Sequence, residues 1–182
     1  WVNDLRWDIT PDDYFEMCHR KTAWYTCITP CWTGAYIAGI DPKYKEKMIR
    51  FGLDLGAAFQ IQDDILNIVG DVDKYGKEIA GDIWEGKRTL VIINLLSKCT
   101  ADEKELILKI LNKPREEKNE KEITQILDAI KKYNCVDYAF DISHQLAIYA
   151  RQSYMEMFEN KIDDQYNKII LDLIDFMVNR EL

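Results

Sequence analysis

Apolar residues recur every three or four positions along most of the chain, and this spacing predicts amphipathic helices. Within residues 42–69, Met48, Phe51, Leu55 and Phe59 follow one another at such intervals. Helices are expected over residues 11–32, 42–69, 88–97, 102–111, 121–133, 136–159 and 163–180. The strict alternation that indicates a half-buried strand does not occur, so an all-α architecture of helices packed on helices is expected.

Prolines and glycines mark the expected ends of these helices. Thr10 and Asp41 each precede a proline, a pattern typical of helix N-termini. All eight glycines lie between residues 34 and 86, and residues 70–86 predict a glycine-punctuated loop between two helices. The polar segment 112–119 predicts a second loop.

The composition is that of a folded, soluble protein, and 182 residues suit a single domain over residues 1–182. With 24 Lys and Arg against 32 Asp and Glu, the net charge is −8, which argues against a nucleic-acid partner because phosphate binding needs a basic surface. No run of about 18 apolar residues predicts a membrane span, and the first residues do not resemble a signal peptide.

The five cysteines are odd in number and lack a paired spacing, which argues against a disulfide framework. A zinc site would be short of ligands, because the chain has only 2 histidines. We therefore expect free thiols that are buried or half-buried, and a cytoplasmic location.

The strongest chemical signal is a pair of adjacent carboxylates, Asp63 and Asp64, in an otherwise apolar helical segment. Asn67 follows Asp63 by four residues and shares its face. Such oxygens suit Mg²⁺, which takes one or two carboxylates and leaves its other positions to water and phosphate. The alternative is an ordinary solvated helix face. The apolar neighbours favour the metal site, since a divalent ion relieves repulsion between buried carboxylates.

Basic residues flank this segment in the sequence. Lys77, Lys87 and Arg88 lie in or next to the glycine-punctuated loop, and Lys21 precedes Thr22 in the first expected helix. Carboxylates together with lysine and arginine are the composition of a metal–diphosphate site. Taken singly, each lysine is more simply a solvated side chain.

Four motifs follow one another along the chain. They are Tyr14-x-x-Met17-x-x-x-Lys21-Thr22, Gly34-Ala35 with Gly39, residues 56–67 with the two aspartates, and Gly76-Lys77-x-x-x-Gly81-Asp82-x-x-Glu85-Gly86-Lys87. In this order they resemble the trans-isoprenyl diphosphate synthases, or polyprenyl synthetases, especially the geranylgeranyl and farnesyl diphosphate synthases. The likeness covers about residue 4 to at least residue 96.

The resemblance implies an isoprenoid synthase-type helical bundle around a central cavity, usually a homodimer, of which this chain holds the C-terminal portion. It implies a Mg²⁺-dependent prenyltransferase that joins an allylic prenyl diphosphate to isopentenyl diphosphate. The residues implied are Asp63 and Asp64 as metal ligands, Asn67 as a ligand through water, Lys21, Lys77 and Lys87 for the diphosphate, and Lys21, Thr22 and Gln60 at the reacting centre.

The chain departs from the family pattern in two respects. Asn67 stands where many members have aspartate, which we interpret as a mark of a geranylgeranyl-type subgroup. No first aspartate-rich motif is found, because the pairs at residues 12–13 and 163–164 are better interpreted as helix starts. We therefore expect a C-terminal half that needs an N-terminal half, cleaved or on a partner chain, and that is inactive alone.

Two alternatives stay open from the sequence. A class I terpene cyclase on the same fold would use the same metal-assisted ionisation without a second substrate. A non-catalytic helical subunit would only shape a partner's cavity. In each case a truncated bundle exposes apolar faces, so a homo- or hetero-oligomer is expected rather than a monomer.

Overall fold

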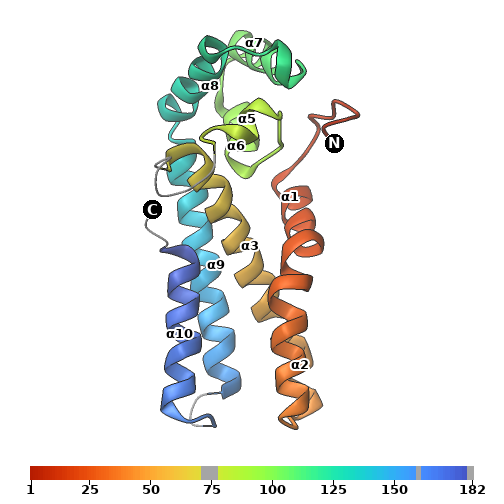
Figure 1. The fold of residues 1–182 in the computed structure, drawn as a ribbon, viewed down its shortest axis with the longest axis vertical. Helices are drawn as coiled ribbons and strands as arrows, with labels where there is room; N and C mark the ends of the chain where they lie inside the picture. The colour runs from red at the N-terminus through yellow and green to blue at the C-terminus, as the bar shows by residue number, and fades with distance from the viewer. Residues whose placement is uncertain (71–77, 159–160, 180–182) are drawn as a thin grey trace. The chain divides into compact units, whose positions relative to one another are not determined.

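The structure is a computed structural model that describes residues 1–70, 78–158 and 161–179. Within these ranges every regular element is a helix (Figure 1), which confirms the all-α class. In chain order the helices are α1 (Pro11–Cys18), η1 (His19–Ile28), α2 (Thr29–Ile37), η2 (Pro42–Tyr44), α3 (Lys45–Val69), α5 (Gly81–Trp84), α6 (Leu90–Lys98), α7 (Ala101–Leu111), η3 (Arg115–Glu117), α8 (Glu120–Lys132), α9 (Cys135–Phe158) and α10 (Asp164–Val178).

The expected helices are present, with small differences at their ends. The first helical stretch continues past residue 32 to Ile37. Pro30 does not end it, because it lies in the first turn of α2, where proline is tolerated. Of the loop expected over residues 70–86, residues 71–77 lie outside the described ranges, and the described part contains the short helix α5. The loop over 112–119 contains a 3₁₀ turn. None of the described helices is long and apolar enough to cross a membrane.

The helix start at Thr10 is capped as expected. The Thr10 hydroxyl accepts a hydrogen bond from the backbone N–H of Asp13 at 3.2 Å, and the Asp13 carboxylate accepts one from the backbone N–H of Thr10 at 2.9 Å. Asp163 stands at the N-cap position of α10, without a side-chain capping bond. The aspartate pairs at residues 12–13 and 163–164 are therefore helix starts, as the sequence indicates.

The chain forms two compact units, which we describe separately. Unit 1 contains residues 1–14 and 63–140, and unit 2 contains residues 15–62 and 141–181. Unit 1 has α6 buried along most of its length, and α7 and α8 with one buried face each. Its first residues are held by Arg88, which donates to the carbonyl of Arg6 at 2.8 Å and stacks on the ring of Trp7.

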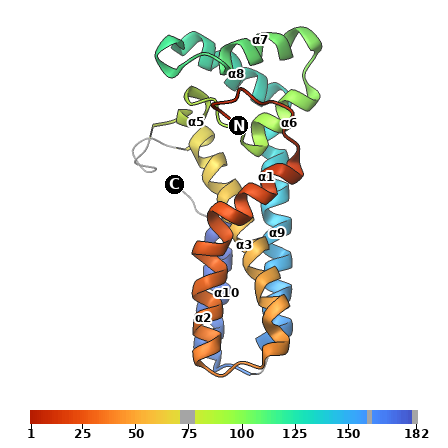
Figure 2. The ribbon, with the colours of Figure 1, turned by 90° about the vertical axis from the view of Figure 1, so that its right-hand side faces the viewer.

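Unit 2 is built from the end of α1, η1, α2, η2, the part of α3 up to Gln62, most of α9 from residue 141 onward, and α10 (Figure 2). Its core is made of side chains from η1, α3, α9 and α10: Cys27, Met48, Phe51, Leu55, Ala58, Ala147, Ala150, Tyr154, Met157, Ile174, Met177 and Val178. The cysteines are free, as expected.

Helices η1 and α3 approach each other backbone to backbone at two glycines. A Cβ added to Gly56 would lie 2.5 Å from the Cα of Ala23, and one added to Gly52 would lie 3.1 Å from the Cα of Ile28. Side chains at these positions would therefore force the helices apart. Gln60 follows Gly56 by four residues, so it lies on the same face of α3, one turn beyond this crossing.

Helix η1 is π-helical, which the sequence does not indicate. Its C-cap N–H, that of Thr29, bonds to the carbonyl of Trp24, five residues back. The buried residues of η1 are Thr22, Ala23, Cys27 and Ile28, which also repeat at five residues. The π-helical turns thus present one continuous face to α3.

Candidate functional site

Thr22 and Gln60 form a buried polar pair in unit 2. The Thr22 hydroxyl donates a hydrogen bond to Oε1 of Gln60 at 2.8 Å, and both residues are only 7% exposed. The close approach of Ala23 and Gly56 makes this distance possible, since each lies beside one member of the pair. The fold therefore brings together two residues that the sequence assigns to the reacting centre. Lys21, next to Thr22, has an exposed side chain.

The two aspartates lie on α3, in unit 1, at different depths. Asp64 is 6% exposed, and Asp63 is half-buried. The hydroxyl of Tyr14, which is completely buried, donates to Oδ2 of Asp64 at 2.7 Å. This bond orients the Asp64 carboxylate and satisfies one of its oxygens. The sequence places Tyr14 in a motif without a role, because its partner lies 50 residues further along the chain.

Asn67 bonds to the loop that follows α3. Its Oδ1 accepts from the backbone N–H of Asp82 at 2.9 Å, and its Nδ2 donates to the carbonyl of Glu78 at 3.3 Å. Its own carbonyl accepts from the backbone N–H of Ala80 at 2.6 Å. Asn67 therefore bonds to three alternate residues of the loop, an interaction that the sequence does not reveal.

The lysine of this loop that the structure describes is ion-paired. Nζ of Lys87 lies 2.7 Å from the carboxylate of Asp82 and 3.2 Å from that of Glu85. Burial alone lowers the pKa of Lys87, but its hydrogen bonds and ion pairs with both carboxylates outweigh burial and hold the pKa above its usual value. Lys87 is therefore a fixed positive charge. Lys77, also expected at the diphosphate, lies outside the described residues.

The chemistry of the aspartate pair fits Mg²⁺. Among the described residues, no three His, Cys, Asp or Glu side chains gather closely enough to hold a metal ion. Asp63 and Asp64 supply two carboxylates, which match the one or two that Mg²⁺ usually takes from a protein when phosphate oxygens and water complete its shell.

The fold, with two carboxylates on a long helix and a lysine-bearing loop after it, defines the class of all-α prenyl synthases. The chain belongs to the polyprenyl synthetase family, whose model matches residues 1–130.

Known relatives agree with this assignment. The chain is 39% identical over 140 residues to the geranylgeranyl diphosphate synthase of Sulfolobus acidocaldarius, an overlap of 77% of this chain and 41% of the relative. The solved geranylgeranyl pyrophosphate synthetase of Pyrococcus horikoshii superposes with a TM-score of 0.82 at 27% identity, over 98% of this chain and 52% of that one.

A further solved structure contains ligands. The geranylgeranyl pyrophosphate synthase of Corynebacterium glutamicum, complexed with isoprenyl diphosphate and magnesium, matches with a TM-score of 0.80 at 25% identity, over 94% of this chain and 47% of that one. The chain thus spans about half the length of the relatives that it matches.

Proposed function

We propose that this chain is the C-terminal part of a Mg²⁺-dependent prenyltransferase that joins an allylic prenyl diphosphate to isopentenyl diphosphate, in a short-chain reaction of the geranylgeranyl type. The observation that carries this proposal is the aspartate pair, half-buried Asp63 beside Asp64 with its carboxylate oriented by Tyr14. Support also comes from the relative that is complexed with isoprenyl diphosphate and magnesium.

Each side chain of the site has a defined part in this reaction. Asp63 and Asp64 would hold Mg²⁺, which when bound would supply positive charge for the diphosphate leaving group. Lys21 and Lys87 bind the diphosphate as point charges. Because the Thr22 hydroxyl donates its hydrogen bond to Gln60, the lone pairs of the Thr22 oxygen would face the allylic carbon as positive charge develops there.

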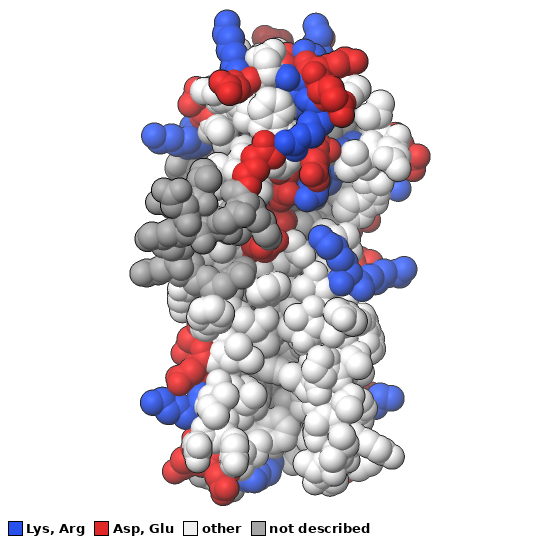
Figure 3. Space-filling model, viewed as in Figure 1, with Lys and Arg blue, Asp and Glu red and all other residues white. Residues whose placement is uncertain are grey.

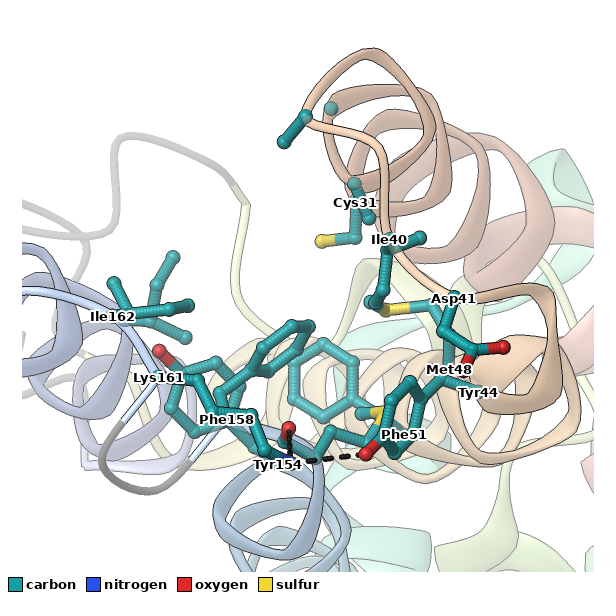
Figure 4. Close-up of a pocket in the computed structure, with 15 residues that line it drawn as sticks. Cys31, Ile40, Asp41, Tyr44, Met48, Phe51, Tyr154, Phe158, Lys161 and Ile162 are labelled. Atoms are coloured by element: carbon teal, nitrogen blue, oxygen red, sulfur yellow. Dashed lines mark hydrogen bonds between the residues drawn. The ribbon is translucent and has the colours of Figure 1, made fainter.

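Unit 2 has an apolar groove in which a further part of the fold could pack. The groove has a volume of about 500 Å³ and lies between α2 and α10, with residues of α3 and α9 as its floor. Figure 4 shows the aromatic rings of Phe51, Tyr154 and Phe158 across the floor, with Cys31 on one side and Ile162 on the other. The face of unit 2 seen in Figure 3 is largely uncharged along this groove.

Exposed apolar side chains continue both walls of the groove outward. On α2, Tyr36 is 71% exposed and Ile37 is 80% exposed. On α10 the exposed residues recur at three and four positions, as in a stripe that packs against another helix: Tyr166, Ile169, Leu173 and Phe176. The occupant that we propose is the N-terminal half of this fold, which carries the first aspartate-rich motif, because the chain spans only about half of its relatives.

The test reconstitutes the chain with the N-terminal half of the Sulfolobus acidocaldarius relative. We expect longer linear prenyl diphosphates from both substrates in the presence of Mg²⁺, and none after chelation. Asp63→Ala with Asp64→Ala should lower the rate by several orders of magnitude. The matched control is Asp128→Ala with Asp137→Ala, which removes two exposed carboxylates from α8 and α9 and should leave the rate unchanged.

Other outcomes decide against the proposal. A cyclic hydrocarbon from a single prenyl diphosphate would identify a terpene cyclase. Full activity of the Asp63→Ala, Asp64→Ala assembly would identify a scaffold subunit. A bound assembly that makes no longer prenyl product would reject the elongation reaction itself.

A further inference from the structure

Asn67 occupies the position at which the family resemblance implies a water-mediated metal contact, but both ends of its amide bond to the loop that follows α3. The residue is 7% exposed, and its amide bonds to the backbone of Asp82 and Glu78. The two partners define the orientation of the amide, because the N–H of Asp82 can only donate and the carbonyl of Glu78 can only accept. The oxygen of Asn67 therefore points to Asp82.

These bonds replace a cap that helix α5 lacks. The N-cap residue of α5 is Ala80, which has no side chain able to cap and stands in the left-handed region at φ 60°. The N–H of Asp82, in the first turn of α5, belongs to the backbone donors that a helix leaves without partners. Oδ1 of Asn67 accepts from this group as an N-cap side chain would, but from a different helix.

The turn that Asn67 caps also holds Lys87, through Asp82. The carboxylate of Asp82 lies 2.7 Å from Nζ of Lys87, and the carbonyl of Asp82 accepts from the backbone N–H of Lys87 at 2.9 Å. A continuous series of hydrogen bonds thus runs from Asn67 through the turn at Asp82 to the Lys87 ammonium. Every member of it lies in unit 1.

The chemistry of the amide explains why asparagine suits this position. An aspartate would keep the acceptor for Asp82, but its second oxygen would face the carbonyl oxygen of Glu78, where Asn67 now donates. An alanine would remove both bonds and leave the N–H of Asp82 without its cap.

We propose that Asn67 is a positioning residue, which holds the turn at residues 78–82 and thereby places Lys87 for the diphosphate, and that it is not a ligand of the metal, directly or through water. The part that concerns Lys87 rests on the proposed function. The holding of the turn does not.

The test compares Asn67→Ala and Asn67→Asp in the assembly of this chain with the N-terminal half. With Asn67→Ala we expect the amide hydrogen of Asp82 to exchange about tenfold faster or more, and inorganic pyrophosphate with Mg²⁺ to bind about tenfold more weakly. Asn67→Asp restores the acceptor, so the exchange of this amide should return close to that of the wild type. The affinity for Mg²⁺ alone, measured by calorimetry, should be the same in Asn67→Ala as in the wild type.

Matched controls come from Asn119, which caps α8 in the ordinary way by accepting from the N–H of Glu122 at 3.1 Å. Asn119→Ala should speed exchange at Glu122 and leave pyrophosphate binding unchanged, so it separates the loss of a cap from the misplacement of Lys87. Asn119→Asp controls for the added charge.

Three results would overturn the proposal. Unchanged exchange at Asp82 in Asn67→Ala would show that the side chain does not hold the turn. An affinity for Mg²⁺ alone that falls by about tenfold or more in Asn67→Ala would show that residue 67 takes part in binding the metal. Wild-type pyrophosphate affinity in a folded Asn67→Ala assembly would reduce the residue to a structural role.

The proposed function can fail separately. If the wild-type assembly binds no pyrophosphate and makes no prenyl product, the role of Lys87 is rejected. The exchange of the Asp82 amide still decides whether Asn67 holds the turn.

Discussion

Two glycines of unit 2, Gly56 on α3 and Gly34 on α2, have opposite surroundings: the first is tightly packed and the second is open. At Gly56 a Cβ would lie 2.5 Å from the backbone of Ala23, whereas at Gly34 it would meet nothing within 4 Å. The first glycine closes the crossing that carries Thr22 and Gln60, and the second lines the open groove. A small residue can thus mark a contact already made or a surface where another part of the fold is expected to pack.

The largest expected effect is at the closed crossing. Gly56→Ala should lower the free energy of unfolding by about 1–3 kcal/mol, because the new methyl group meets backbone atoms that cannot move aside. Urea denaturation of this chain alone would measure it. Gly34→Ala is the matched control in the same preparation, where it should be neutral or stabilise by up to about 1 kcal/mol. If both variants lost the same free energy of unfolding, the contrast between a packed and an open glycine would be wrong.

The open groove gives the next effect. Leu173→Asp should weaken binding of the N-terminal half by about tenfold or more, because it introduces a charge into the exposed apolar stripe of α10. Leu106, at 48% exposure, matches Leu173 at 47% but lies on α7 in unit 1. Leu106→Asp should leave this affinity unchanged in a titration calorimeter, and a similar loss from both variants would argue against the groove.

A smaller effect is expected from the polar pair at the closed crossing. Thr22→Val keeps the shape of the side chain and removes its hydroxyl, so it should cost about 1 kcal/mol of stability and lower kcat. Thr22→Ser should recover most of both. Thr124→Val also removes a hydroxyl, that of an exposed residue of α8, which donates to the carbonyl of Glu120, and it should change kcat little. Normal kcat in Thr22→Val would remove this pair from the reacting centre.

The smallest effect concerns Asp54, which lies between the two crossing glycines and pairs with Arg50 at 2.9 Å. Burial raises the pKa of the Asp54 carboxyl, although Arg50 opposes the change. Because the folded pKa lies above the unfolded one, the stability contributed by Asp54 is present at low pH and lost as the pH rises through the folded pKa. The stability of Asp54→Asn relative to the wild type should therefore increase as the pH rises above the usual carboxyl range.

Glu103 in unit 1 should behave in the opposite way. Hydrogen bonds from Lys132 and Tyr133 lower the pKa of Glu103 to about 2. Its contribution is therefore present above the unfolded pKa and lost as the pH falls toward about 2. Glu103→Gln should lose stability relative to the wild type as the pH rises over that interval. Thermal melts at several pH values would measure both variants. If their stabilities relative to the wild type changed with pH in the same direction, the predicted opposite behaviour of Asp54 and Glu103 would be wrong.

The sequence predicts the helices well, because each buries an apolar face at the usual helical spacing. It does not predict α5, which has four residues and lies in a glycine-rich loop. It also does not predict the π-helical form of η1, since that form changes the spacing of the buried residues.

The aspartate pair and the roles of Thr22 and Gln60 follow from motifs. The bonds of Tyr14 and Asn67 do not, because their partners are distant in the chain or belong to the loop backbone.

The π-helical stretch also limits how the chain can change in length. Thr22, Ala23, Cys27 and Ile28 face α3 because the turns of η1 are one residue wider than those of an α-helix. Deleting a single residue there would allow ordinary α-helical bonds, but it would rotate the preceding segment by about 100° and turn Thr22 away from Gln60. Substitutions in η1 are therefore easier to accommodate than insertions or deletions, and homologous chains that keep this pair should keep the length of this helix.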